Sequence, residues 1–185
     1  MPWSGGSRRS RAVSESNILG RLARLRVFVG FVFGALVLWL SEPTGQTVAA
    51  GALVASLGEA VRIWAAGHLQ KSAEVTASGP YRWFSHPLYL GSSVMGIGLA
   101  IASGSVRAAL LIGGYLLVAL SVAAKSEEAF LRRTFGDQYD RYRRGVADGS
   151  RRFSWARVKA NREHRAVIGF LLAAGLLALK AAGTV

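Results

Sequence analysis

The chain has 185 residues, the size of one domain, and it contains no cysteine, which excludes disulfide bonds, thiolate metal ligands and thiol nucleophiles. It is 51% hydrophobic, yet 23 lysines and arginines against 10 acidic residues give a net charge of +13. The cations are concentrated in blocks, with six in residues 1–26 and twelve in residues 125–165. Such blocks are typical of an integral membrane protein and favour anionic lipid headgroups, rather than nucleic acid, as the partner of the charge.

Residues 1–20 are rich in Ser, Gly and Arg and predict a disordered basic tail, and residues 21–185 then form a single transmembrane domain. Five apolar stretches predict an all-α polytopic helix bundle. The expected spans are approximately 22–41, 47–66, 87–105, 108–124 and 166–182. The first is long enough only if Arg21, Arg24 and Arg26 snorkel to the headgroups. The last is short, and if it lies in the interface the bundle has four spans. A cleaved signal peptide is the alternative for residues 1–50.

The distribution of cations orients these spans. The arginine-rich start and residues 125–165 are placed in the cytoplasm, whereas residues 41–46 carry no cation and are placed outside. The connection 67–86 carries Lys71 and Arg82 and is cytoplasmic as well. The sequence therefore predicts a cytoplasmic N-terminus and two cytoplasmic segments, 67–91 and 125–146, in which polar residues gather.

The first cytoplasmic segment predicts a turn followed by a helix start. Gly79-Pro80 is a turn signal, and Pro87 suits the first turn of the third span, where His86 before it is biased away from helix. Open amides near Leu88 and Tyr89 then face the cytoplasm, and together with the helix dipole they form a site for a carboxylate or phosphate.

Four aromatic rings and two cationic or titratable groups lie between residues 81 and 89. An interfacial aromatic belt is the structural interpretation of this composition. The turn and the helix start favour a binding site instead. Gly91, one turn into the span, has no side chain and permits close approach of a ligand or of a neighbouring helix.

The second cytoplasmic segment predicts an amphipathic helix. Leu131, Phe135, Tyr139 and Tyr142 form one stripe at helical spacing. Gly136-Asp137 is expected to interrupt the helix, with Asp137 capping the second piece. Such a helix lying on an anionic leaflet is the structural interpretation.

Acidic residues at two positions do not fit that interpretation. Glu127 and Glu128 stand where the fourth span meets a basic surface, which suggests a cationic ligand or a nearby arginine. Within the second span, Glu59 and Arg62 are three residues apart and can pair, as a functional or a structural pair. His164 lies in a basic tail, where we expect only solvation.

Taken together and in order, several motifs resemble the isoprenylcysteine carboxyl methyltransferase-like family, integral membrane enzymes related to phospholipid N-methyltransferases. The resemblance covers about residues 58–146. It is carried by Gly79-Pro80-Tyr81-Arg82, Ser85-His86-Pro87-Leu88-Tyr89-Leu90-Gly91, Glu127-Glu128 and Phe135-Gly136-x-x-Tyr139-x-x-Tyr142.

The resemblance implies an S-adenosylmethionine-dependent methyltransferase that acts on a lipophilic acceptor at the cytoplasmic face of a membrane, for which we expect a bacterial inner membrane. It implies no metal site, and no obligate protein partner is evident. The implied cofactor-binding residues are Gly67, His68, His86, Pro87, Tyr89, Gly91, Glu127 and Glu128, and we add Tyr81, which with Tyr89 and His86 is expected to line the adenosine or sulfonium. We assign Arg82 and His86 as catalytic residues, and Arg82, Arg143, Tyr139 and Tyr142 to the acceptor.

More specific roles follow as hypotheses. Glu127 or Glu128 holds the ammonium or ribose hydroxyls of the donor, and the helix start after Pro87 holds its carboxylate. Arg82 or Arg143 steers an anionic acceptor. If the acceptor is an amine, His86 is the expected base.

The sequence departs from the family in two places. Ser85 stands where the family usually has Arg before His-Pro, so that role is vacant or passes to Arg82. The apolar segment 166–182 follows the point where the family core is expected to finish. A phospholipid N-methyltransferase, an NADPH-dependent sterol-type reductase with a similar His-Pro-x-Tyr-x-Gly stretch, and a non-enzymatic lipid-binding scaffold remain the alternatives.

Overall fold

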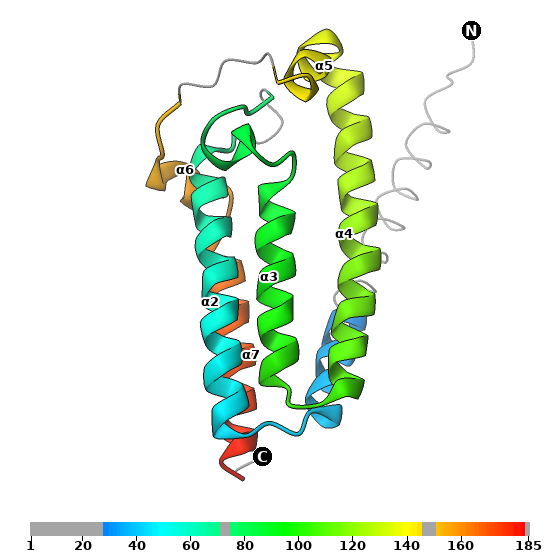
Figure 1. Ribbon diagram of the computed structural model, residues 1–185, viewed down its shortest axis with the longest axis vertical. Helices are drawn as coiled ribbons and strands as arrows, with labels where there is room; N and C mark the ends of the chain where they lie inside the picture. The colour runs from blue at the N-terminus through cyan, green and yellow to red at the C-terminus, as the bar shows by residue number, and fades with distance from the viewer. Residues whose placement is uncertain (1–27, 71–74, 146–150, 184–185) are drawn as a thin grey trace, which may run out of the picture. The chain divides into compact units, whose positions relative to one another are not determined.

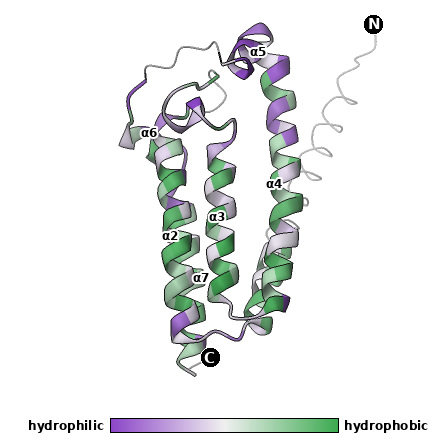
Figure 2. Ribbon diagram, viewed as in Figure 1, coloured by the Kyte–Doolittle hydropathy of each residue, from purple (hydrophilic) through white to green (hydrophobic). Residues whose placement is uncertain are grey.

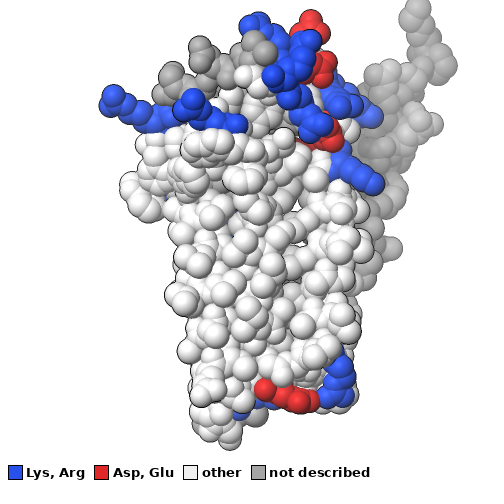
Figure 3. Space-filling model, in the orientation of Figure 1, with Lys and Arg blue, Asp and Glu red and all other residues white. Residues whose placement is uncertain are grey.

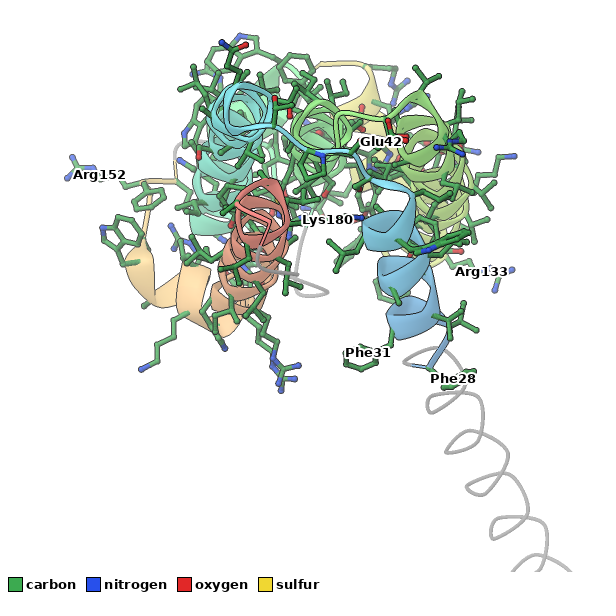
Figure 4. All side chains as sticks on the ribbon, turned by 90° about the horizontal axis from the view of Figure 1, so that it is seen from below. Phe28, Phe31, Glu42, Arg133, Arg152 and Lys180 are labelled. Carbon is green, nitrogen blue, oxygen red and sulfur yellow. The ribbon has the colours of Figure 1, made fainter. Side chains whose placement is uncertain are left out.

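The computed structural model describes residues 28–70, 75–145 and 151–183, and within these ranges every regular element is a helix (Figure 1). The chain divides into two compact units, residues 1–39 and 40–185. In the first unit the described residues belong to the apolar helix Phe28–Leu40. Its side chains at Phe28 and Phe31 are 64% and 77% exposed (Figure 4). The predicted tail and the snorkelling arginines before residue 28 lie outside the described residues.

The second unit contains the remaining elements. They are α2 (Gly45–His68), the 3₁₀ helix η1 (Gly79–Arg82), α3 (Pro87–Ala102), α4 (Val106–Phe135), α5 (Asp137–Arg143), α6 (Trp155–Ala160) and α7 (His164–Ala181). By length and composition α2, α4 and α7 can each cross a membrane, whereas Phe28–Leu40 and α3 are shorter apolar helices. Hydrophobic residues cover much of α2, α3 and α4 in Figure 2. The all-helical, membrane-spanning class is therefore confirmed, and the number of five crossings stays a prediction.

Small residues allow α2 and α3 to pack closely along their length (Figure 1). A Cβ atom added at Gly98 of α3 would lie 2.6 Å from the Gly51 carbonyl oxygen and 2.7 Å from Cα of Ala55, both on α2. Backbones approach this closely only where side chains are absent or very small, which is the usual way membrane helices associate. Helix α7 packs mainly against α2 and to a smaller extent against α3.

Helix α4 joins the predicted fourth span and the first piece of the predicted amphipathic helix in one element. It continues past residue 124 to Phe135, because residues 125–135 contain no glycine or proline and are rich in strong helix formers. It ends at Gly136, whose φ of +43° is a left-handed value that favours glycine. The predicted role of Asp137 as the N-cap of the second helix is wrong. Gly136 occupies the N-cap of α5, and Asp137 is its first helical residue.

Helix α3 begins at Pro87, with His86 at the N-cap, as predicted. It ends at Ala102, three residues before the predicted end, because the chain turns at Ser103 and Gly104. The Ser103 hydroxyl donates to the Ala100 carbonyl at 2.6 Å and thereby stabilises the turn.

Charged side chains collect at the end of the second unit where α3 begins, next to α5 and α6 (Figure 3). Arg133 of α4 and Arg152 both point away from the helices there (Figure 4). The opposite end carries an exposed pair in which Arg107 lies 2.7 Å from Glu42. We call the first of these ends the α3-start end.

Candidate functional site

The centre of the candidate site is a contact between the start of α3 and the C-terminal third of the long helix α4. Nδ1 of His86 lies 3.4 Å from Oε2 of Glu127. The His86 ring also stacks on Tyr89, with ring centroids 5.4 Å apart. A carboxylate beside an imidazole orients the ring, and an imidazole can accept or donate a proton, so this pair can take part in proton transfer.

The two neighbouring glutamates of α4 contact different parts of the protein, as expected for residues about 100° apart around a helix. Glu127 faces His86, whereas Oε1 of Glu128 lies 3.3 Å from Arg132 and 3.8 Å from Arg143. Arg143, predicted to steer the acceptor, is therefore placed beside Glu128.

Two tyrosines join α5 to the 3₁₀ turn. The Tyr142 hydroxyl donates to the Tyr81 carbonyl oxygen at 2.9 Å. Tyr81 is only 8% exposed, and burial, assisted by the nearby Glu127 charge, raises the pKa of its hydroxyl. Burial is also the main cause that raises the pKa of Tyr142 to about 12. Both phenols are therefore neutral at neutral pH, and the Tyr142 hydroxyl keeps the proton that it donates.

Tyr139, predicted to contact the acceptor, is almost completely buried at 1% exposure. Its hydroxyl makes no hydrogen bond of normal geometry among the described residues, and the Glu128 carboxylate is close enough to interact with it. Burial, the Glu128 charge and this interaction raise the pKa of Tyr139. A buried hydroxyl without such a hydrogen bond is unusual in a folded protein, and it marks a place where a polar ligand atom can bind.

A second group of predicted residues lies at the C-terminal end of α2. Nδ1 of His68 is 3.2 Å from the Ser78 hydroxyl. Gly79, with a φ of +59°, lies against the same ring: a Cβ there would come within 2.6 Å of Cγ of His68. The Phe153 ring covers Gly67 so closely that any side chain at this position would collide with it. The 3₁₀ helix thus links the two groups, with Gly79 next to His68 and Tyr81 bonded to Tyr142.

The sequence interpretation missed the residues that close the end of α2. The side-chain amide of Asn161 donates to the carbonyls of Ala66 and Leu69, both at 3.0 Å. Arg157 Nε donates to the Gly67 carbonyl at 2.8 Å. The last carbonyls of a helix lack intrahelical donors, and these contacts supply them. The only signal in the sequence was Ser154 before a short helical stretch, which is too common a pattern to be specific.

The first turn of α3 is less open than predicted. The Tyr89 amide donates to the His86 carbonyl at 3.0 Å, which leaves Leu88 as the first-turn amide without a hydrogen-bond partner among the described residues. Pro87 is fully buried at the helix start.

Gly91 and Arg82 complete the predicted set. The close approach at Gly91 is made by α2: a Cβ there would lie 2.7 Å from both the Gly58 carbonyl and Cγ of Arg62. Of the two alternatives for Gly91, the neighbouring helix is the one observed. Arg82 ends the 3₁₀ helix and is exposed.

Comparisons with known proteins agree with the family resemblance. The sequence model of the phospholipid methyltransferase family matches residues 29–138, which include His86, Glu127 and Glu128. The chain is 30% identical over 105 residues to protein-S-isoprenylcysteine O-methyltransferase of Schizosaccharomyces pombe, covering 57% of this chain and 44% of that protein. No solved structure matches the chain.

Two bacterial proteins are similar to a comparable degree. The nickel-cobalt-cadmium resistance protein NccN of Alcaligenes xylosoxydans xylosoxydans is 28% identical over 134 residues, covering 67% of this chain and 61% of that protein. The cobalt-zinc-cadmium resistance protein CzcN of Cupriavidus metallidurans is 29% identical over 147 residues, covering 75% and 67%. The chain thus spans less than half of the yeast protein and about three fifths of NccN.

Proposed function

We propose a methyl-transfer function for this chain, which belongs to the phospholipid methyltransferase family. The methyl donor is S-adenosylmethionine, and the acceptor is a lipophilic molecule that reaches the α3-start end from the membrane. The observation that carries the proposal is the contact between His86 and Glu127 at 3.4 Å, within the residues that the family model matches.

The residues at this end fit the donor in three respects. Its ammonium and ribose hydroxyls require acceptors, which Glu127 and Glu128 provide. Its carboxylate requires donors, and the Leu88 amide at the start of α3 offers one, with the helix dipole in the favourable sense. The Tyr139 hydroxyl, buried without a hydrogen bond of normal geometry among the described residues, supplies a further polar contact.

S-adenosylmethionine supplies an electrophilic methyl group on a sulfonium. The protein aligns the reactants and excludes water, and a near-attack arrangement can contribute ~7–11 kcal/mol of the barrier. The rings of Tyr81 and Tyr89 offer faces for a cation. When the acceptor has a proton to lose, His86 accepts it, and Glu127 stabilises the resulting imidazolium.

Two classes of acceptor are compatible with the site, a carboxylate and an amine, and the His86–Glu127 pair supports the amine. A carboxylate acceptor needs no base but needs a cation, and because Ser85 precedes His86, the cation for that role is Arg82. An amine headgroup needs a base, which the pair supplies. Comparing methyl transfer to a prenylated carboxylate and to an amine phospholipid in one assay separates these classes, and Arg82→Gln impairs only the first.

We further propose that the α3-start end faces the cytoplasm of a bacterial cell and contacts anionic headgroups there. Its concentration of Lys and Arg supports this orientation (Figure 3). Because the chain has no cysteine, single cysteines at Asp140 and Gly45 report the two ends. In intact spheroplasts a membrane-impermeant maleimide should label only Gly45→Cys. Labelling of Asp140→Cys alone would show that the orientation is the reverse of the one proposed.

The donor site is tested by calorimetry with S-adenosylhomocysteine and the purified protein in detergent. We expect saturable binding that weakens at least tenfold in the Glu127→Gln/Glu128→Gln double variant, since each charged hydrogen bond contributes about 1.5–3 kcal/mol. Glu42→Gln, at the opposite end, is the matched control and should bind normally. Binding that is unchanged in the double variant contradicts the assignment of the two glutamates.

A parallel titration with NADPH addresses the reductase alternative. Saturable binding of NADPH without binding of S-adenosylhomocysteine would replace the proposal by that alternative. Binding of neither by a folded sample would favour the lipid-binding scaffold.

A further inference from the structure

Beside Gly91, three charged side chains meet where α2 and α3 face the start of α7. Nη2 of Arg62 lies 2.8 Å from Oε2 of Glu163, the N-cap residue of α7, and donates a hydrogen bond to it. Nη1 of Arg62 donates to the hydroxyl of Ser92 on α3. Glu59, one turn before Arg62 on α2, has Oε2 3.6 Å from Nε of the same guanidinium.

The charges of this cluster do not balance. One guanidinium faces two carboxylates, and the hydrogen bond goes to Glu163. Both carboxylate oxygens of Glu59, and the Nε of Arg62 that faces them, lack a hydrogen-bond partner among the described residues. Glu59 is 5% exposed and Glu163 6% exposed, so water does not compensate the excess negative charge.

The position of Glu59 makes this charge costly. Glu59 lies nine residues before the end of α2, roughly 13 Å along the axis at the rise of an α-helix, and thus well within a helix long enough to cross a membrane. The charged groups that act on it are Arg62 from its own helix and Glu163 from the start of α7, and α3 contributes only the uncharged Ser92. A buried carboxylate in such surroundings is stabilised when a proton or a metal cation binds to it and neutralises its charge.

We propose that Glu59 binds a single monovalent cation, either a proton or a sodium ion, and that the docked arrangement of α7 requires this ligand. Glu163 occupies the guanidinium of Arg62, and the bound cation neutralises the second carboxylate. When the Glu163 carboxylate is absent, Arg62 is able to hydrogen-bond to Glu59, with which it already forms an ion pair at 3.6 Å, and the ligand is released. Glu163 lies beyond residues 29–138, so the site depends on the helices that follow the family core.

The proton is tested by infrared difference spectroscopy of the purified full-length protein in nanodiscs at neutral pH. We expect the carbonyl band of a protonated carboxylic acid, which shifts in D₂O and disappears in Glu59→Gln. The band should also disappear in Glu163→Gln, and it should persist in the control Glu42→Gln. Glu59→Gln imitates the protonated form and should keep the unfolding midpoint of the native protein.

The sodium ion is tested by thermal unfolding in sodium chloride and in choline chloride at equal ionic strength. A midpoint that rises only with sodium, in the native protein and not in Glu59→Gln, supports sodium as the ligand. The absence of both the exchangeable carbonyl band and the sodium effect in the native protein overturns the proposal. This last outcome overturns the proposal even if Glu59→Gln does not fold, because it is measured on the native protein alone.

Discussion

Tyr142 of α5 donates its hydroxyl to the backbone carbonyl of Tyr81 at 2.9 Å, across 61 positions of the sequence. This bond fastens the short helix that follows α4 onto the turn that precedes α3. His86 stands five residues after Tyr81, and its partner Glu127 lies on α4. The geometry of the His86–Glu127 pair therefore depends on a contact to which neither residue contributes.

Replacing Tyr142 by phenylalanine should loosen this turn. The Tyr81 carbonyl loses its donor, which costs about 1–3 kcal/mol when the group stays buried. We expect a lower unfolding midpoint in detergent and weaker binding of S-adenosylhomocysteine by calorimetry. An unchanged midpoint together with unchanged affinity would show that the bond does not position the site.

The same hydroxyl predicts a loss of stability at alkaline pH. Burial raises the pKa of Tyr142 to about 12 in the folded protein, against about 10 for an exposed tyrosine. The unfolded chain therefore loses this proton first, so the contribution is complete below pH ~10 and is lost as the pH rises to about 12. Unfolding midpoints measured across this range should fall more steeply for the native protein than for Tyr142→Phe. An equal fall of the two midpoints with pH would show that the Tyr142 hydroxyl does not cause the loss of stability.

The sequence predicted the elements whose signals are local. Pro87 identified the start of α3, and the apolar stretches identified the helices, because helix starts and hydrophobic runs depend on residues close in the chain. The predicted break at Gly136 was confirmed as well, since only a residue that tolerates a positive φ ends α4 there. The predicted span end at residue 124 is not visible as a helix end, because loss of hydrophobicity ends a span but does not end a helix.

The contacts between distant segments could not be predicted. Nothing near Arg62 indicates that its partner is Glu163, 101 positions later, and nothing near Gly67 indicates that Phe153 covers it. The two possibilities for Gly91 were likewise decided only by the packing of α2. Pairings of this kind arise from how the helices pack, which a single sequence does not specify.

Replacing glycine by alanine should have opposite effects at a packed and at an open position. Gly98→Ala places a methyl group 2.6 Å from the Gly51 carbonyl oxygen, so the helices must separate, at a cost of about 1–3 kcal/mol. Gly113→Ala in α4 meets nothing within 4 Å and should stabilise the protein by up to about 1 kcal/mol through helix propensity. Thermal unfolding in the same detergent checks both. Equal effects at the two positions would argue against close packing at Gly98.

Asn161 predicts how strongly the C-terminal segment holds the end of α2. Asn161→Ala removes the donor that two carbonyls share, and we expect a loss of about 1–3 kcal/mol. Asn161→Asp keeps the size but puts a negative charge against the negative end of the helix dipole, so it should be worse than alanine. Lys159→Ala, an exposed neighbour, should leave stability unchanged.

Hydrogen exchange separates a local from a global effect of these changes. If Asn161 acts as a cap, exchange should quicken first in peptides that cover residues 63–70, where Phe153 and Arg157 also contact α2. Because His68 lies in this stretch and contacts Ser78, the 3₁₀ turn should loosen with it, and binding of S-adenosylhomocysteine should weaken. Faster exchange throughout α2, or an aspartate variant as stable as alanine, would mean that the amide does not cap the helix. The segment after the family core would then contribute through packing alone.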